Sequence, residues 1–317
     1  MAGFKSFREF NNALDNGQGH LLHFTKSLPA SQNTSVSIWR DFSGGVGPAS
    51  PPNYFASSPG VAATLANPAG LNTEGLVFIP QTSAGSSHYI RKITAMTFAT
   101  SAAAAQLQQS TFWLMDYLLY YPFVDLTVTD LQPFTNIVTL PRYVTGEGTR
   151  ILWIMQSGGG TSAPSVTINY TNQAGVSKSV LVEPSQSSVI AGEIVGPTTR
   201  SANTAFNSNL SLTQLFVPLA SGDTGVRSIE SVQLSSDFGG IAAFVIVKPI
   251  AQFHVAQESR VNSNISYGAA SELEFVRMRA GLAKFEDNPF LMLVGRHVSG
   301  ASSQNALVIG TIETIWN

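Results

Sequence analysis

The stretch from Thr111 to Asp130 constrains the fold of this chain most, because it is the most apolar part of the sequence. Every residue from Phe112 to Val124 is aliphatic or aromatic except Asp116 and Pro122. A membrane-spanning helix needs roughly 18 or more consecutive apolar residues, whereas this run is shorter and is interrupted by a proline. The run therefore predicts one or two buried strands, bent at Pro122, and no membrane segment.

Asp116 is the one charged residue inside this apolar run. Burial would raise the pKa of its carboxyl group, and carboxylates with a perturbed pKa gather at functional sites. The alternative, which we favour, is a carboxylate that faces water from an edge strand or pairs with an arginine. Trp113, Tyr117, Tyr120 and Tyr121 would suit a sugar-binding platform, but their continuous apolar setting favours the core or a subunit interface.

The composition is poor in charge for a chain of 317 residues. Charged residues make up 11% of it, under half the usual share of roughly 25%, and Ser, Thr, Asn, Gln and Gly supply the polar surface. Charge normally keeps a monomer soluble. This composition therefore indicates a surface that is covered by other subunits. The apolar share of 44% is too high for intrinsic disorder.

The charge balance and the absence of cysteine exclude several classes of function. The formal net charge is −2 and no Lys/Arg cluster occurs, so direct binding of nucleic acid is not expected. The chain has no cysteine, which excludes disulfides, thiolate zinc sites and a cysteine nucleophile. Residues 1–10 lack the apolar core of a secretory signal, which predicts a soluble product made in the cytoplasm.

The remaining apolar segments have the length and spacing of strands. Val166, Ile168 and Tyr170 alternate with polar residues, and a turn at 172–175 leads to an expected hairpin partner at Val180–Val182. Further short apolar segments, bounded by turn residues, are Leu76–Pro80, Ile90–Phe98, Leu152–Met155, Leu291–Val294 and Ala306–Trp316. The fold class predicted is mainly β, an antiparallel β-sandwich or jelly-roll-like fold with a few short helices.

Two segments have helical spacing. Phe4, Phe7, Phe10 and Leu14 share one face of a short amphipathic helix that should end near residues 16–17. This helix either covers the chain's own core or forms an arm that packs on a neighbouring subunit. The second predicted helix begins after Ser271 as N-cap and extends to about residue 282.

A weak internal repeat in the spacing of apolar residues suggests two related sandwich halves. Two sets of four apolar residues share the same spacing, namely Ile90, Ile93, Met96 and Phe98, and Val226, Ile229, Val232 and Leu234. We therefore expect an N-terminal arm with a short helix in residues 1–40 and a first sandwich half in 41–140. Residues 141–317 are expected to form a second β-rich domain. A long Gly/Pro-rich connector over 41–75 is easier to understand if a partner covers it.

The sequence carries no pattern of a catalytic, cofactor or metal site. The phosphate-binding glycine motifs, the nucleophile elbow and the His-Glu-x-x-His zinc motif are all missing. Gly158–Gly160 is interpreted as a flexible turn. Asp223 and Asp237 lie in glycine-flanked turns, where the side chain of an aspartate caps the backbone. The five histidines, His20, His23, His88, His254 and His297, lack metal-ligand spacing and are expected to be structural or on the surface.

Two pairs of segments resemble virion structural proteins of tailed bacteriophages. The first pair is Leu140-Pro-Arg-Tyr143 with Gly146-Glu-Gly148, and the second is Phe216-Val-Pro-Leu219 with Gly225-Val-Arg-Ser-Ile229. The similarity covers roughly residues 75–250, together with the cysteine-free, Ser/Thr/Gly-rich composition. It implies a β-rich shell component, such as a cement or minor capsid protein, with no catalytic residues to carry over.

The function expected from these observations is a non-enzymatic virion structural protein that binds copies of itself and a major capsid protein. It would be made in the host cytoplasm and located in the virion, with no cofactor, metal, nucleic acid or membrane as partner. The candidate interface residues are Phe4, Phe7, Phe10, Leu14, Tyr117, Tyr120 and Tyr121. One alternative is a β-sandwich carbohydrate- or receptor-binding module of a phage tail, in which Trp113 or Trp153 would bind the sugar. The other is a hydrolase with scattered acids.

Overall fold

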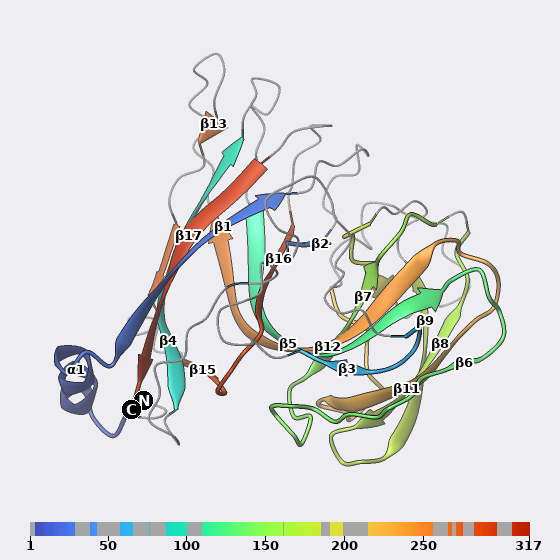
Figure 1. Ribbon diagram of the computed structural model, residues 1–317, viewed down its shortest axis with the longest axis horizontal. Coiled ribbons are helices and arrows are strands. Elements are labelled where there is room, and N and C mark those ends of the chain that lie inside the picture. Colours follow the sequence, from blue (N-terminus) through green and yellow to red (C-terminus); the bar gives the residue numbers. More distant parts are fainter. Residues whose placement is uncertain are drawn as a thin grey trace.

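A computed structural model describes residues 4–28, 39–42, 58–65, 76, 87–99, 110–160, 162–184, 191–198, 215–255, 266–267, 271–274, 282–296 and 306–317. These residues are mainly β, with antiparallel sheets and a single short helix. Figure 1 shows the strands in two groups, which the long strands β5 and β12 connect. The predicted fold class is therefore confirmed.

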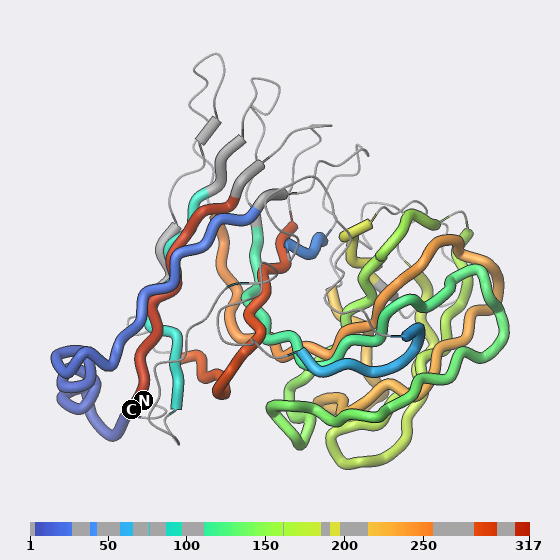
Figure 2. The backbone as a smooth tube through the Cα atoms, viewed as in Figure 1, coloured from blue at the N-terminus to red at the C-terminus, as the bar shows by residue number. Residues whose placement is uncertain are grey.

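The first sheet contains the first and the last strand of the described residues, and we call it the terminal sheet. Its order is β1 (Gly19–Leu28), β17 (Ala306–Trp316) and β4 (His88–Ala99). Figure 2 shows β1, in blue, running along β17, in red. Three short strands pair with the other edge of β4, namely β13 (Ser266–Tyr267), β14 (Ser271–Glu274) and β15 (Ala283–Phe285).

The central sheet is built around the apolar run of the sequence. Its order is β2 (Trp39–Asp41), β16 (Leu291–Arg296), β5 (Ser110–Asp125), β12 (Ile241–Val255) and β7 (Arg150–Met155), and β3 (Ala63–Thr64) also pairs with β5. The antiparallel pairing of β5 and β12 extends from Ser110 opposite Val255 to Asp125 opposite Ile241. The apolar run thus forms one strand with irregular pairing around Pro122.

The third sheet, which we call the hairpin sheet, covers one half of the central sheet. Its order is β10 (Pro197–Thr198), β9 (Ser177–Pro184), β8 (Val166–Asn172), β11 (Val226–Leu234) and β6 (Gln132–Pro133). The predicted hairpin is confirmed, because Val166 pairs with Val182 and Thr171 pairs with Ser177. The alternating burial of β8 matches the period-two pattern of its sequence.

The position of the central sheet explains why β5 is apolar on both sides. Phe112 and Leu114 pack against the terminal sheet, and Tyr121 packs in the core shared with the hairpin sheet. Met115 and Tyr120 belong to a separate core on the opposite face. A strand with both faces buried has no position for a water-facing residue, so its sequence is a continuous apolar run.

The N-terminal helix is confirmed as α1 (Phe7–Asp15), with Ser6 as its N-cap. The Ser6 Oγ accepts a hydrogen bond from the Glu9 N–H at 3.1 Å, which satisfies one of the free amide groups at the start of the helix. Phe10 packs with Phe4, Tyr89 and Ile315. The helix therefore covers its own chain at the end of the terminal sheet, where Figure 1 shows it beside both termini.

The second predicted helix is wrong at its start. Ser271–Glu274 forms strand β14, which pairs with Lys92–Ala95 of β4, while residues 275–281 lie outside the described part of the chain. Helical spacing is a weak preference, and pairing with an exposed sheet edge outweighs it. The described residues hold one helix, where the sequence predicted a few.

Several predictions lie outside the described residues. These are residues 77–80 of the strand expected at Leu76–Pro80, and most of the connector 41–75.

The two segments with the same spacing of apolar residues form β4 and β11, and the strands that follow them, β5 and β12, pair with each other. The division into domains at residues 40 and 140 stays a prediction.

Candidate functional site

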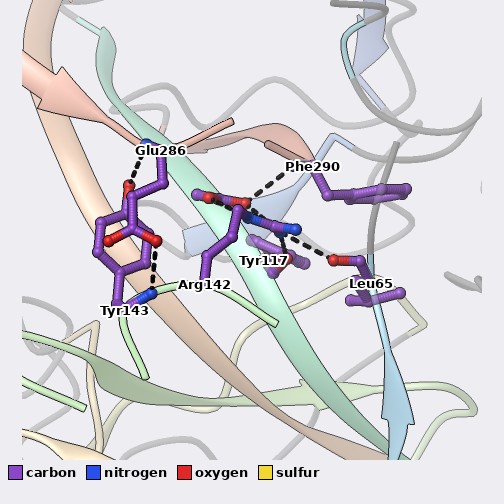
Figure 3. A network of polar contacts seen from close by, with 7 residues as sticks. Leu65, Tyr117, Arg142, Tyr143, Glu286 and Phe290 are labelled. Atoms are coloured by element: carbon purple, nitrogen blue, oxygen red, sulfur yellow. Dashed lines mark hydrogen bonds and ion pairs between the residues drawn. The ribbon is translucent and has the colours of Figure 1, made fainter. Parts of the chain in front are cut away.

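Asp116 and Arg142 form a fully buried ion pair at the middle of β5 (Figure 3). The Arg142 Nε donates to Asp116 Oδ2 at 2.8 Å, and its Nη2 donates to Asp116 Oδ1 at 2.7 Å. The same Nη2 also donates to the carbonyl oxygens of Leu65 and Tyr117. The Phe290 N–H donates to Asp116 Oδ1 at 2.8 Å. Both carboxylate oxygens of Asp116 and the Nε and Nη2 groups of Arg142 thus have partners inside the protein, as a buried ion pair requires.

A second pair of contacts lies beside this ion pair. The Tyr143 N–H donates to Glu286 Oε2 at 2.9 Å, and the Glu286 N–H donates to the Tyr143 hydroxyl at 3.2 Å. Together the two sets of contacts join four segments distant in sequence: β5, the residue after β3, the segment before β7 and the segment before β16. Figure 3 shows the side chains converging on β5 from these segments.

The electrostatics of Asp116 follow from its enclosure. Burial raises the pKa of its carboxyl group, while the hydrogen bonds and charge of Arg142 and the Phe290 N–H act in the opposite direction. Burial is also the main reason that the pKa of Tyr143 is raised well above its usual range. Asp116 has no exposed surface and Arg142 is 4% exposed, so a substrate cannot reach either group. This arrangement is a structural clamp of the kind expected when Asp116 pairs with an arginine.

One segment of each pair behind the bacteriophage resemblance lies against a segment of the other pair, Gly146-Glu-Gly148 against Gly225-Val-Arg-Ser-Ile229. Glu147 and Gly225 form an antiparallel bridge, and the Gly148 N–H donates to the Thr224 carbonyl at 3.0 Å. The Thr149 hydroxyl donates to the Val226 carbonyl at 2.6 Å and accepts from the Val226 N–H at 2.8 Å. A Cβ on Gly146 or Gly225 would meet backbone atoms of the other segment, which explains the glycines at these two positions.

Replacing Gly225 by alanine is expected to lower the free energy of unfolding by about 1–3 kcal/mol, the usual range for overpacking. A Cβ on Gly225 would overlap the backbone carbonyl of Gly146, and a backbone atom cannot move aside as a flexible side chain can. Gly19→Ala is the matched control, because a Cβ there makes ordinary contacts at 3.6 Å or more. Urea unfolding monitored by circular dichroism measures both variants, and equal stability would contradict the close approach.

The three candidate interface tyrosines of β5 are core residues. Tyr117, Tyr120 and Tyr121 have no exposed surface. The Tyr117 hydroxyl donates to Asp41 Oδ2, the Tyr120 hydroxyl accepts from Gln156 Nε2, and the Tyr121 hydroxyl donates to Asn136 Oδ1. Their side chains are therefore used within the chain and are closed to a partner.

The four candidates of the N-terminal helix divide by exposure. Phe4 and Phe10 are buried in the core under α1, and Leu14 is half-buried against it. Phe7 is 56% exposed, although its ring stacks on Phe10 at 6.0 Å. Phe7 is thus the candidate with a largely exposed ring in the free chain, and its role in an interface stays a prediction.

The histidines and acids are dispersed in the structure. The described residues contain no group of three or more His, Asp or Glu side chains placed to hold a metal ion. His88 is buried with its Nε2 2.7 Å from Asp287 Oδ1, and His254 Nδ1 lies 3.0 Å from the Thr111 hydroxyl. Asp223 accepts hydrogen bonds from the Tyr170 hydroxyl and the Asn172 amide. Those bonds lower the pKa of its carboxyl group. His297 lies outside the described residues.

The sequence did not identify Arg142 as the partner of Asp116. Arg142 lies 26 residues from Asp116, in one of the segments that carry the bacteriophage resemblance. No local pattern links the two positions, since each lies in a different element. The one available signal was the rule that a carboxylate within an apolar run needs a buried cation.

The comparisons with known proteins give weak results. No family model matches the chain, and no curated protein matches it. It shows a weak likeness to two solved structures, that of the Gx strain of infectious bursal disease virus and that of the virus's VP2 subviral particle. Each is 10% identical in sequence, with 94% of this chain and 81% of the other chain covered and a TM-score of 0.17. A TM-score this low carries no argument about fold or function, and neither structure comes from a tailed bacteriophage.

In the part of the chain that the structure describes, no helix has the length and apolar character needed to cross a membrane.

Proposed function

We propose that this protein is a non-enzymatic structural protein of a bacteriophage virion, a capsid cement or minor capsid component. It is made in the host cytoplasm and stabilises a shell by contacts with copies of itself and with a major capsid protein. The observation that carries the proposal is the outer end of the terminal sheet, where the apolar side chains of Phe7 and Leu21 are exposed on a chain with very few charges.

We call this surface the α1–β1 margin and define it by Phe7, Leu21 and the outer edge of β1. Leu21 is 47% exposed and Phe7 is 56% exposed. Within the described residues, β1 pairs with β17 and with no other strand. Its outer row of N–H and C=O groups therefore faces away from the sheet. An edge strand of this kind can pair with a strand of another chain.

The composition supports the same assignment. Protein interfaces exclude charge from their cores because each charge must lose its hydration when the surfaces meet. Because 11% of the residues in this chain are charged, few charges would have to lose their hydration at each contact. A shell protein makes many such contacts at once, so a charge-poor surface is of more use to it than to a monomer.

Mass spectrometry of purified particles tests the proposal directly. We expect the chain to be present in intact virions at a fixed copy number relative to the major shell protein. We expect light scattering of the purified protein to show a symmetric oligomer. A chain that stays monomeric at high concentration and never co-sediments with particles would rule the proposal out.

The double variant Phe7→Ser/Leu21→Ser tests the α1–β1 margin. We expect it to raise the dissociation constant of the oligomer at least tenfold, because it removes the exposed apolar side chains of the margin. Leu181→Ser on β9 is the matched control, since Leu181 is 60% exposed on the hairpin sheet. Sedimentation velocity compares the three proteins. A loss of association in the control, with none in the double variant, would place the interface elsewhere.

A further inference from the structure

A cleft of about 520 Å³ opens on the face of the central sheet that points away from the other two sheets. Its volume lies within the range of small-ligand sites, roughly 300–1,000 Å³. The lining comes from β2, β5, β7, β12 and residues 215–219, with Asp223 at one side. Residues 215–219 are held against β7 by the hydrogen bond from the Val217 N–H to the Ile151 carbonyl at 2.9 Å.

Aromatic rings form one wall of this cleft. Trp113 and Phe216 are both half-buried, and their ring centroids lie 6.0 Å apart in an edge-to-face arrangement. Trp39 also lines the cleft and is 5% exposed. Among the described residues, the Trp39 Nε1–H has no hydrogen-bond partner. A buried N–H without a partner costs free energy unless a ligand or water accepts from it.

Polar side chains lie beside the rings. Gln252 stands directly opposite Trp113 in the register of β12 and β5, and it is exposed. Arg150 is held at the start of β7 by hydrogen bonds from its Nη1 to the carbonyls of Thr149 and Thr224. Asp223 supplies one negative charge to offset the positive charge of Arg150. The cleft therefore offers amide, carboxylate and guanidinium groups whose charges sum to zero.

We propose that this cleft binds a neutral saccharide. A sugar ring has an apolar face, which suits stacking on Trp113, and a rim of hydroxyl groups, which suits the planar polar groups of Gln252 and Asp223. The charges of Asp223 and Arg150 offset each other, so the cleft gives a charged ligand no net attraction, and a purely apolar ligand would leave the Gln252 amide without a partner. The α1–β1 margin has no part in this cleft, so the inference goes beyond the proposed function.

A printed array of neutral gluco-, galacto- and N-acetylglucosamine oligosaccharides is the first test. The oligosaccharide with the strongest signal is then titrated into the full-length protein by calorimetry. We expect saturable binding, which Trp113→Ala weakens at least tenfold. Gln252→Ala, at an exposed position of β12, is expected to weaken it roughly two- to tenfold, as the loss of one hydrogen bond does.

Leu181→Ser is the control, because Leu181 is 60% exposed on β9 and lies outside both the cleft and the α1–β1 margin. It is expected to leave the sugar affinity unchanged. No saturable binding to any arrayed sugar, or an affinity that neither Trp113→Ala nor Gln252→Ala reduces, would overturn the inference. Both results leave the particle and light-scattering tests of the shell role unaffected, so the two proposals can fail independently.

Discussion

Replacing Arg142 by alanine is expected to lower the free energy of unfolding by about 3–5 kcal/mol, the usual loss when one partner of a buried ion pair is removed. The variant leaves the Asp116 carboxylate fully enclosed without its cation. It also leaves the carbonyl oxygens of Leu65 and Tyr117 without the donor that Arg142 supplies. Urea unfolding followed by tryptophan fluorescence gives the free energy, with the slope of the transition compared between variants.

A double-mutant cycle separates the pair from its surroundings. We expect Asp116→Ala and Arg142→Ala together to cost less than the sum of the two single variants, because each single variant leaves an unpaired buried charge. Arg91→Ala is the control, since its ion pair with Glu313 is about a third exposed on both sides. That variant should lose about 1 kcal/mol or less. Additive losses in the cycle would show that the ion pair is not the source of the effect.

Replacing Trp153 by alanine is the second large effect expected, a loss of about 3–5 kcal/mol. Trp153 is fully buried on β7, with its ring 5.7 Å from that of Phe238 and 5.6 Å from that of Phe244. The substitution would leave a cavity in the core between the central sheet and the hairpin sheet. The two packed sheets would keep the surrounding side chains from filling it. Thermal unfolding by calorimetry measures the loss.

Trp153→Phe separates the volume of the ring from its polar group. The Trp153 Nε1–H has no hydrogen-bond partner among the described residues, so phenylalanine gives up no polar contact there. We expect a clearly smaller loss than with alanine. A loss as large as that of Trp153→Ala would mean that the indole N–H makes a stabilising contact. In either case Trp153 is enclosed in the core, so Trp113 is the residue to change when testing sugar binding.

Local structure was the part of the fold that could be predicted. The alternation of Val166, Ile168 and Tyr170 predicted β8, because successive side chains of a strand point to opposite faces. The helix at Phe7–Asp15 followed from its apolar spacing, and its N-cap is Ser6. Both patterns depend on residues within a few positions of one another, and so are visible along the chain.

The candidate site could be predicted only in part. Asp116 was identified as the unusual residue of its run, and the favoured alternative was that it either faces water from an edge strand or pairs with an arginine. The choice of Arg142 depends on how the segment before β7 crosses β5, which no local pattern records. For the same reason Tyr117, Tyr120 and Tyr121 were proposed for an interface, because an apolar run can be buried by another subunit or by the chain's own sheets.

The amino-acid sequence by itself determined the class of this protein: a charge-poor, cysteine-free β chain with an apolar run too short for a membrane helix. Only the tertiary structure decided what that run does. Sheet packing buries both faces of β5 in separate cores and places Asp116 in an ion pair with Arg142. It also leaves the half-buried Trp113 beside the exposed Gln252 at the cleft. The physical reason is that burial and ion pairing depend on residues brought together by sheet packing, whereas strand and helix formation depend on neighbours in sequence.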